Sequence, residues 1–312
     1  MPENLYPSVA SLTTAYNSAD LLLGNIDALL GQKRPLQEII VVDNASSDET
    51  SSLLRTRYPE VTVLRMPENV GMGGALAAGL TYAAFTQRHD WVWMFDQDSV
   101  PSPHALKIML EELQQLVGSA SEVGILAALP IDKNTEKSST PWLWRNRFIK
   151  PSAELFHQSL WFADLVITSG SMVRREVVEK IGFPRSDFFI DFVDYEYCLR
   201  ARSHGYKIAV ITRALLYHEV GKAQKVRFWL GRYHLWSEHR PFREYYYSRN
   251  LVYTVWWLYP SLAAKGFLLL HLMRHAVGVI LFGPERLASL KKIVQGFLDG
   301  CRASLGIRFR PD

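Results

Sequence analysis

Residues 91–99 read Trp91-Val92-Trp93-Met94-Phe95-Asp96-Gln97-Asp98-Ser99, an apolar run that leads into two carboxylates one residue apart. The run is typical of a buried strand. Carboxylates at the end of such a strand can hold a divalent cation, and the cation can neutralise a diphosphate. A strand followed by an Asp-rich turn explains the same sequence without a metal, because Asp and Ser are common turn residues and two prolines follow. The rest of the chain must distinguish a metal site from a turn.

Short apolar runs alternate with stretches of helical period from the start to about residue 130, which predicts an α/β fold with a mostly parallel sheet flanked by helices. The predicted strands are residues 8–14, 38–42, 61–65 and 91–95, and the predicted helices are residues 18–30, 46–57 and 74–85. Asn17, Asp43, Asn69 and Asp96 each lie just past a predicted strand. Since parallel sheets bind ligands at the carboxyl ends of their strands, these side chains are expected in one cleft.

The second half of the chain is less regular. Residues 133–140 are polar and residues 141–148 are aromatic and basic, which predicts irregular structure or a lid. Further on, the pattern predicts a strand interrupted at Gly170, two helices and a second strand: residues 165–173, 175–181, 194–204 and 207–212.

Composition excludes a disordered or repetitive protein, since 48% of the 312 residues are hydrophobic and 21% are charged. The two cysteines, Cys198 and Cys301, have neither metal-binding nor disulfide-framework spacing. No secretory signal precedes the first predicted strand, so the cytoplasm is the expected compartment.

Positive charge concentrates in residues 261–312, which carry eight Lys or Arg against three acids. Because apolar residues accompany this charge, an anionic membrane is a better partner than nucleic acid. Residues 266–283 are apolar but interrupted by two histidines and Arg274, so a transmembrane helix is the second choice. Residues 286–297 place apolar side chains on one face, as in an interfacial helix; a helical hairpin packed on the core is the alternative.

Three further segments carry candidate chemistry, each with a structural alternative. Asp43 can accept the ring N–H of a pyrimidine, with Thr14 and Tyr16 lining the base pocket, or it can cap the next helix. The glycines of residues 68–75 permit a diphosphate or its sugar to approach a helix start, or they form a tight turn. The acids of residues 191–196 can supply a general base, or they mark an acidic helix start.

The order of these motifs resembles that of inverting glycosyltransferases with the GT-A fold. The sequences of residues 95–99, 191–202 and 243–250 are most similar to those of bacterial rhamnosyltransferases, and they are also similar to those of galactofuranosyltransferases. The resemblance covers roughly residues 8–250. It implies a GT-A domain at residues 1–250 and leaves residues 251–312 as a helical, aromatic and basic region that associates with membrane.

For the donor, the resemblance implies that Thr14, Tyr16 and Asp43 bind the pyrimidine nucleotide. Asn69, Gly73, Asp96 and Gln97 would contact the rest of the donor. Asp98 would bind Mg²⁺ or Mn²⁺ directly, and His218 resembles the histidine that completes the metal site in galactofuranosyltransferases; a lone His is as often structural.

For the acceptor, the resemblance makes Asp194 the catalytic base and gives Glu196 the place of the last acid in the motif. Val193 replaces the acid that supports the base in the family, so Asp191 is the candidate for that support. Gly170 and Arg249 are further candidates for support or acceptor contacts.

The expected reaction is transfer of L-rhamnose from dTDP-rhamnose to a hydroxyl of a lipid-linked saccharide at the inner face of the plasma membrane, in bacterial surface-polysaccharide synthesis. A galactofuranosyl or other hexosyl transferase that uses a UDP-sugar is the first alternative. A nucleotidyltransferase would need a basic Gly-rich loop near the N-terminus, which residues 8–24 lack. A noncatalytic saccharide-binding protein is the remaining alternative.

Overall fold

The computed structural model describes residues 7–116, 120–133, 138, 141–218, 223–227, 233–237 and 240–311. The chain divides into two compact units. The first unit comprises Met1–Leu143, Ile149–Ser186 and Asp194–His218, and the second comprises Trp144–Phe148, Asp187–Val193 and Glu219–Asp312. The predicted domain boundary at residue 250 stays a prediction.

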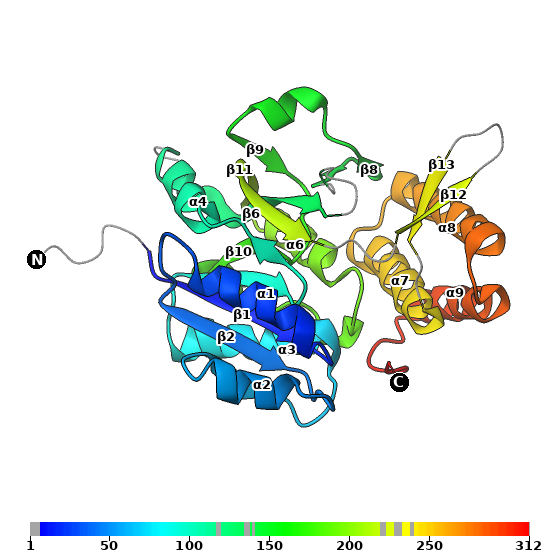
Figure 1. The fold of residues 1–312 in the computed structure, drawn as a ribbon. Coiled ribbons are helices and arrows are strands. Elements are labelled where there is room, and N and C mark those ends of the chain that lie inside the picture. Colours follow the sequence, from blue (N-terminus) through cyan, green and yellow to red (C-terminus); the bar gives the residue numbers. More distant parts are fainter. Residues whose placement is uncertain are drawn as a thin grey trace, which may run out of the picture. The chain divides into compact units, whose positions relative to one another are not determined.

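The first unit is built on one large, mostly parallel sheet with the strand order β3-β2-β1-β4-β10-β6-β11-β5 (Figure 1). Neighbours from β3 to β4 are parallel, as are β6 and β11, whereas β10 runs antiparallel between β4 and β6. The strands are β1 (Val9–Ala15), β2 (Glu38–Asp43), β3 (Thr62–Arg65), β4 (Trp91–Asp96), β5 (Val100–Pro101), β6 (Val123–Asp132), β9 (Leu160–Ala163, paired with β11), β10 (Ser171–Arg174) and β11 (Lys207–His218). The predicted α/β class is confirmed.

Helices follow most of these strands, as the alternating pattern predicts. They are α1 (Ala19–Leu30), α2 (Thr50–Arg57), α3 (Gly71–Leu80), α4 (Ala105–Gln114), α5 (Arg175–Ile181) and α6 (Val193–Ser203). A π-helical turn, Thr81–Thr86, extends α3, and short 3₁₀ turns lie at Ala120–Glu122, Ala153–His157 and Ser186–Phe188. The short strands β7 (Leu143–Trp144) and β8 (Phe148–Ile149) pair with each other.

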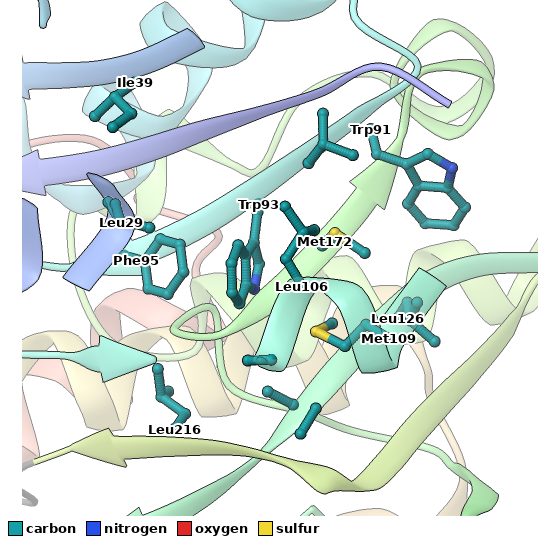
Figure 2. Packing of buried hydrophobic residues seen from close by; sticks show 14 of the residues in the cluster. Leu29, Ile39, Trp91, Trp93, Phe95, Leu106, Met109, Leu126, Met172 and Leu216 are labelled. Atoms are coloured by element: carbon teal, nitrogen blue, oxygen red, sulfur yellow. The ribbon is translucent and has the colours of Figure 1, made fainter. Parts of the chain in front are cut away.

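The main core lies around β4, whose residues 91–95 are all buried. Trp93 and Phe95 meet edge to face with ring centroids 4.7 Å apart. Met172 from β10 and Leu106 and Met109 from α4 belong to the same cluster (Figure 2). A strand covered on both faces needs an unbroken apolar run, which is why residues 91–95 lack the alternation of a half-exposed strand.

Three predicted elements are wrong in extent. The strand predicted at residues 207–212 continues to His218 as β11, because its second half also pairs with β6. The strand predicted at residues 165–173 is reduced to β10, because Gly170 adopts a φ of +78° and the Ser171 N–H bonds to the Thr168 carbonyl in a turn. The helix predicted at residues 46–57 begins only at Thr50, where the Asp48 carboxylate accepts the Thr50 N–H at 3.0 Å. The long strand β6 and helix α4 were not among the predicted elements.

The second unit is mainly helical. It contains α7 (Pro241–Tyr253), a π-helical turn (Thr254–Leu258), α8 (Leu262–Phe282) and α9 (Arg286–Cys301), together with the hairpin of β12 (Ala223–Arg227) and β13 (Tyr233–Ser237). Helices α7 and α9 pack closely because Gly296 and Gly300 present no side chain. A Cβ at Gly300 would lie 2.7 Å from the Arg249 carbonyl oxygen, and one at Gly296 would overlap that of Tyr245.

Gly296→Ala is expected to destabilise the protein by about 2 kcal/mol, because the new methyl group meets the backbone of α7 and the two helices must separate. The matched control is Gly266→Ala in α8, where a Cβ has no neighbour within 4 Å. There alanine should stabilise the helix by roughly 0.5 kcal/mol. Urea unfolding measures both, and an equal effect of the two substitutions would contradict the close helix contact.

Candidate functional site

Asp96, Asp98 and His218 converge at one edge of the sheet. One ligand atom from each lies within 4.8 Å of the others, a grouping that suits a metal ion. The strand path explains the convergence: after Asp98 the chain turns back as β5, and Val100 pairs with Tyr217 of β11. His218 Nδ1 thereby lies 3.1 Å from Asp98 Oδ1. Two carboxylates and an imidazole are a donor set that fits Mn²⁺ or Mg²⁺.

Two serines that the sequence did not single out support this cluster. The Ser169 hydroxyl donates to Ser99 Oγ at 2.6 Å and accepts the Asp96 N–H at 3.1 Å. Ser99 Oγ in turn lies 2.8 Å from His218 Nδ1. Both serines are buried, so the chain of hydrogen bonds fixes the backbone at Asp96 and the imidazole ring together. The position of Ser99 beside the carboxylate motif was the only available signal.

The carboxylates control the protonation of His218. Burial lowers the pKa of the imidazole, but the hydrogen bond to Asp98 and the negative charges of Asp96 and Asp98 outweigh burial and raise the pKa above its ordinary value of 6.5. A metal ion binds the neutral imidazole, so it must displace this proton.

Stability should therefore depend on pH in opposite ways with and without metal. In chelator, the contribution of protonated His218 is present below its unfolded pKa and is lost as pH rises through the raised pKa. With Mn²⁺, stabilisation by the metal should grow over the same rise in pH, because fewer protons compete. Thermal unfolding between about pH 5.5 and about pH 8.5 measures both trends.

The control for this pH series compares two histidine variants. His218→Gln should flatten both dependences, whereas His104→Gln, at an exposed position, should leave them unchanged. A Mn²⁺-induced shift of the wild-type melting temperature that did not vary with pH would contradict a metal bound through His218.

Asp43 ends β2 and is completely buried. Its Oδ1 accepts the Ser46 N–H at 2.9 Å, and its Oδ2 accepts from Arg65 Nη1 at 2.7 Å and from the Ser51 hydroxyl. The bond from Ser46 closes a local turn. The predicted alternative, a cap on the next helix, is wrong, because α2 begins only at Thr50 and has no side-chain cap. The contact of Asp43 with a pyrimidine stays a prediction.

The other predicted donor residues lie at the same ends of the central strands. Thr14 of β1 is in register with Val42 on one side and Asp96 on the other. The Tyr16 N–H donates to Gln97 Oε1 at 2.8 Å, which links the end of β1 to the carboxylate motif. The structure thus places Thr14, Tyr16 and Gln97 next to the metal-type cluster, which comprises Asp96, Asp98 and His218.

The glycine-rich segment is ordered by asparagine side chains. Asn69 Oδ1 accepts the Gly71 N–H at 2.9 Å and the Asn44 amide at 3.1 Å. A Cβ at Gly73 would overlap the Arg185 carbonyl oxygen, so protein packing alone requires that glycine. The donor contacts of Asn69 and Gly73 stay predictions.

The acids of the catalytic-base motif have different surroundings. Asp194, in the first turn of α6, is half-buried, and its Oδ1 accepts the Tyr195 N–H at 2.8 Å. Glu196 is buried and forms two hydrogen bonds with Arg200, at 3.0 and 2.8 Å. Asp191 belongs to the second unit, where it pairs with Arg243 at 2.5 Å. The charge of Glu196 is therefore neutralised within the protein by Arg200.

The two remaining candidates have structural partners. Gly170 needs its positive φ, and a Cβ there would lie 2.7 Å from Leu216. Arg249 is fully buried and donates to backbone carbonyls at Asp187, Phe188 and Gly306. These contacts favour support over direct contact with an acceptor.

Known proteins of similar sequence cover this chain to different extents. The succinoglycan biosynthesis protein ExoO of Rhizobium meliloti is 35% identical over 106 residues, and the match covers 34% of this chain but only 29% of that protein. The dTDP-rhamnosyl transferase RfbF of Shigella flexneri is 25% identical over 313 residues, with 98% of each chain covered. The galactofuranosyltransferase GlfT1 of Mycolicibacterium smegmatis is 20% identical over 254 residues, which is 78% of this chain and 82% of that one.

A solved structure agrees in fold. The mannosyltransferase PcManGT from Pyrobaculum calidifontis, in complex with GDP-Man and Mn²⁺, has a TM-score of 0.54 at 17% identity, over 96% of this chain and 76% of that one. This likeness supports the predicted GT-A fold. The model of "Glycosyl transferase family 2" matches residues 12–182, more than half of the sequence. The chain is a glycosyltransferase that belongs to glycosyl transferase family 2.

Proposed function

We propose that this protein transfers L-rhamnose from dTDP-rhamnose to a hydroxyl of a lipid-linked saccharide in bacterial surface-polysaccharide synthesis, with inversion at the anomeric carbon. The observation that carries the proposal is the convergence of Asp96, Asp98 and His218 at the end of β4 in a family 2 chain. The similarity to RfbF over nearly the whole of both chains supports the choice of sugar.

The metal-type cluster explains how the leaving group would be stabilised. Asp98 and His218 would hold Mg²⁺ or Mn²⁺, and the ion supplies positive charge for the nucleoside diphosphate. PcManGT was solved with Mn²⁺ and a nucleotide sugar, which supports this choice of cofactor and donor class. Thr14, Tyr16 and Asp43 would bind the base, and Asn69, Gly73, Asp96 and Gln97 would bind the rest of the donor.

Asp194 would act on the acceptor. As the acceptor oxygen forms its bond to the anomeric carbon, the Asp194 carboxylate takes the hydroxyl proton. The bond from that carbon to the diphosphate breaks on the opposite side, and dTDP leaves with the electron pair. Because the arrangement requires one displacement only, the configuration of the sugar inverts.

A galactofuranosyl or other hexosyl transfer from a UDP-sugar is the second candidate. The similarity to GlfT1 over 82% of its length supports it. Both candidates need the same cluster and the same base, so they differ in donor recognition alone.

Thermal-shift screening of the purified protein with dTDP-rhamnose, UDP-galactofuranose, UDP-glucose and GDP-mannose, each with Mn²⁺, tests the proposal. A ligand that binds only the folded state raises the melting temperature. We expect the largest rise with dTDP-rhamnose, followed by slow release of dTDP to water. A larger shift with another of the four sugars, or no shift and no release with dTDP-rhamnose, would contradict the proposed rhamnosyl transfer.

The second unit offers a surface for the membrane on which a lipid-linked acceptor would lie. Among the described residues, α8 alone is long and apolar enough to cross a membrane by length and composition. Besides Leu262 at its start, its exposed large apolar side chains are Leu269, Leu270, Met273, Val277, Ile280 and Leu281. Arg274 is exposed in the same helix. Because a charged side chain at the bilayer centre costs free energy, an interfacial position is more favourable for this helix than one that spans the membrane. We propose that α8 lies on the cytoplasmic face of an anionic plasma membrane.

Replacing Leu269, Met273 and Val277 together by Glu should abolish binding to vesicles that contain phosphatidylglycerol, because three exposed apolar side chains that would enter the membrane interface become charged. Cosedimentation measures the bound fraction. Leu21→Glu is the control, since Leu21 is 50% exposed on α1 in the first unit. Equal binding by the triple variant and the control would contradict docking through α8.

A further inference from the structure

The segment that leads into Asp194 is held in a strained conformation. Phe189, Asp191 and Phe192 have φ angles of +66°, +59° and +65°. The left-handed region is unfavourable for residues with a Cβ, and a cluster of such residues persists only where the surroundings hold it. Val193 follows at once and begins α6, so the backbone of residues 187–192 determines where the first turn of that helix starts.

Asn250 of α7 holds this loop by its backbone. The two N–H groups of its side-chain amide donate to the carbonyl oxygens of Phe188 at 3.0 Å, Ile190 at 2.8 Å and Asp191 at 2.8 Å, so one N–H is shared between two carbonyls. Asn250 is completely buried, so no water competes for these bonds. One side chain therefore fixes three carbonyls of the strained loop.

Arg249 orients that asparagine. Arg249 Nε donates to Asn250 Oδ1 at 2.9 Å, and Nη2 donates to the carbonyls of Asp187 at 2.8 Å and Phe188 at 3.0 Å. The Arg249 guanidinium also lies 4.7 Å from the Tyr246 ring, which stacks on Phe189 with centroids 4.9 Å apart. The amide can then present only its donors to the loop.

We propose that Asn250, oriented by Arg249, is a positioning residue that sets the start of α6 and thereby the carboxylate of Asp194. The proposal rests on the proposed role of Asp194 as base. A group placed on a mobile helix start would lose the geometry that proton transfer needs, whereas the donor residues on β1, β2 and β4 would keep theirs.

The test compares Asn250→Asp with Ser248→Ala. The aspartate keeps the size and the acceptor oxygen for Arg249 but loses the amide donors. Ser248 is buried in the same helix and donates to the Ile293 carbonyl at 2.9 Å, away from the loop. The assay is steady-state release of dTDP from dTDP-rhamnose with Mn²⁺, and dTDP-induced thermal shifts report donor binding.

Asn250→Asp should lower kcat by about tenfold or more with KM for dTDP-rhamnose within about threefold, while Ser248→Ala changes neither by more than about twofold. Asn250→Ala should give the same pattern. If either Asn250 variant folds and keeps the kcat of Ser248→Ala, or if neither folds, Asn250 serves stability alone and the proposal is overturned. Absence of dTDP release by wild-type protein would overturn the proposed function instead.

Discussion

Asp194→Asn should abolish sugar transfer while leaving donor binding in place. The amide keeps the shape of the side chain but cannot take a proton, and loss of a general base typically lowers the rate by about 10²- to 10⁴-fold. Release of dTDP from dTDP-rhamnose in the presence of a lipid-linked acceptor measures the rate. The thermal shift given by dTDP-rhamnose with Mn²⁺ measures donor binding, and it should match that of the wild type.

The control for this experiment is Glu179→Gln. Glu179 is exposed on α5 and pairs with Arg175 at the surface, so its replacement should not change the rate. Turnover by Asp194→Asn at the rate of this control would rule out Asp194 as the base. The candidates would then be the remaining acids of the motif, of which Glu196 is already neutralised by Arg200.

Asp98→Asn should remove the dependence of the enzyme on metal together with most of its activity. The amide lacks the negative charge that holds a divalent cation. Loss of a residue that hydrogen-bonds to a metal ligand lowers metal affinity or activity by about 10- to 100-fold, and loss of the ligand itself should lower them at least as much. Mn²⁺ titration followed by dTDP release measures both the affinity and the maximal rate. Excess chelator should bring the wild type to the same low rate.

The control for the Mn²⁺ titration is a variant that loses a carboxylate far from the metal-binding residues in the sequence. Asp20→Asn removes an exposed carboxylate from the first turn of α1 and should leave the Mn²⁺ dependence unchanged. Full activity of the wild type in chelator, or an unchanged Mn²⁺ response in Asp98→Asn, would contradict the metal site. The proposed roles of Asp194 and Asp98 are thus separable, because only the second concerns the cation.

The central strands were predictable because their apolar sequences indicate that they are buried. Residues 91–95 form an unbroken apolar run, as a strand covered on both faces must. By contrast, the position of β10 between β4 and β6 depends on pairing with two distant segments, and no local pattern encodes it. The strand β6 also contains Gly124 and Pro130, which interrupt the usual strand pattern.

The candidate site was predictable where one motif supplied the residues. The pair Asp96 and Asp98 stands in the sequence as it stands in the structure, next to the end of a strand. Ser169 gave no signal, because its contact with Ser99 spans 70 positions. Asn250 stands in the motif of residues 243–250, but its role could not be predicted, since its three carbonyl partners come together only in the folded loop.

The antiparallel strand β10 has a consequence for synthesis of the protein. Strands β1 to β4 can pair as soon as they leave the ribosome, but the free edge of β4 must wait for residues 171–174. At about 5–20 residues per second, that delay lasts several seconds. Until then the nascent chain exposes an apolar strand with unpaired backbone groups, which is the kind of edge that other chains can join. The interval between synthesis of Asp96 and Arg174 is therefore when the growing polypeptide most needs protection from aggregation.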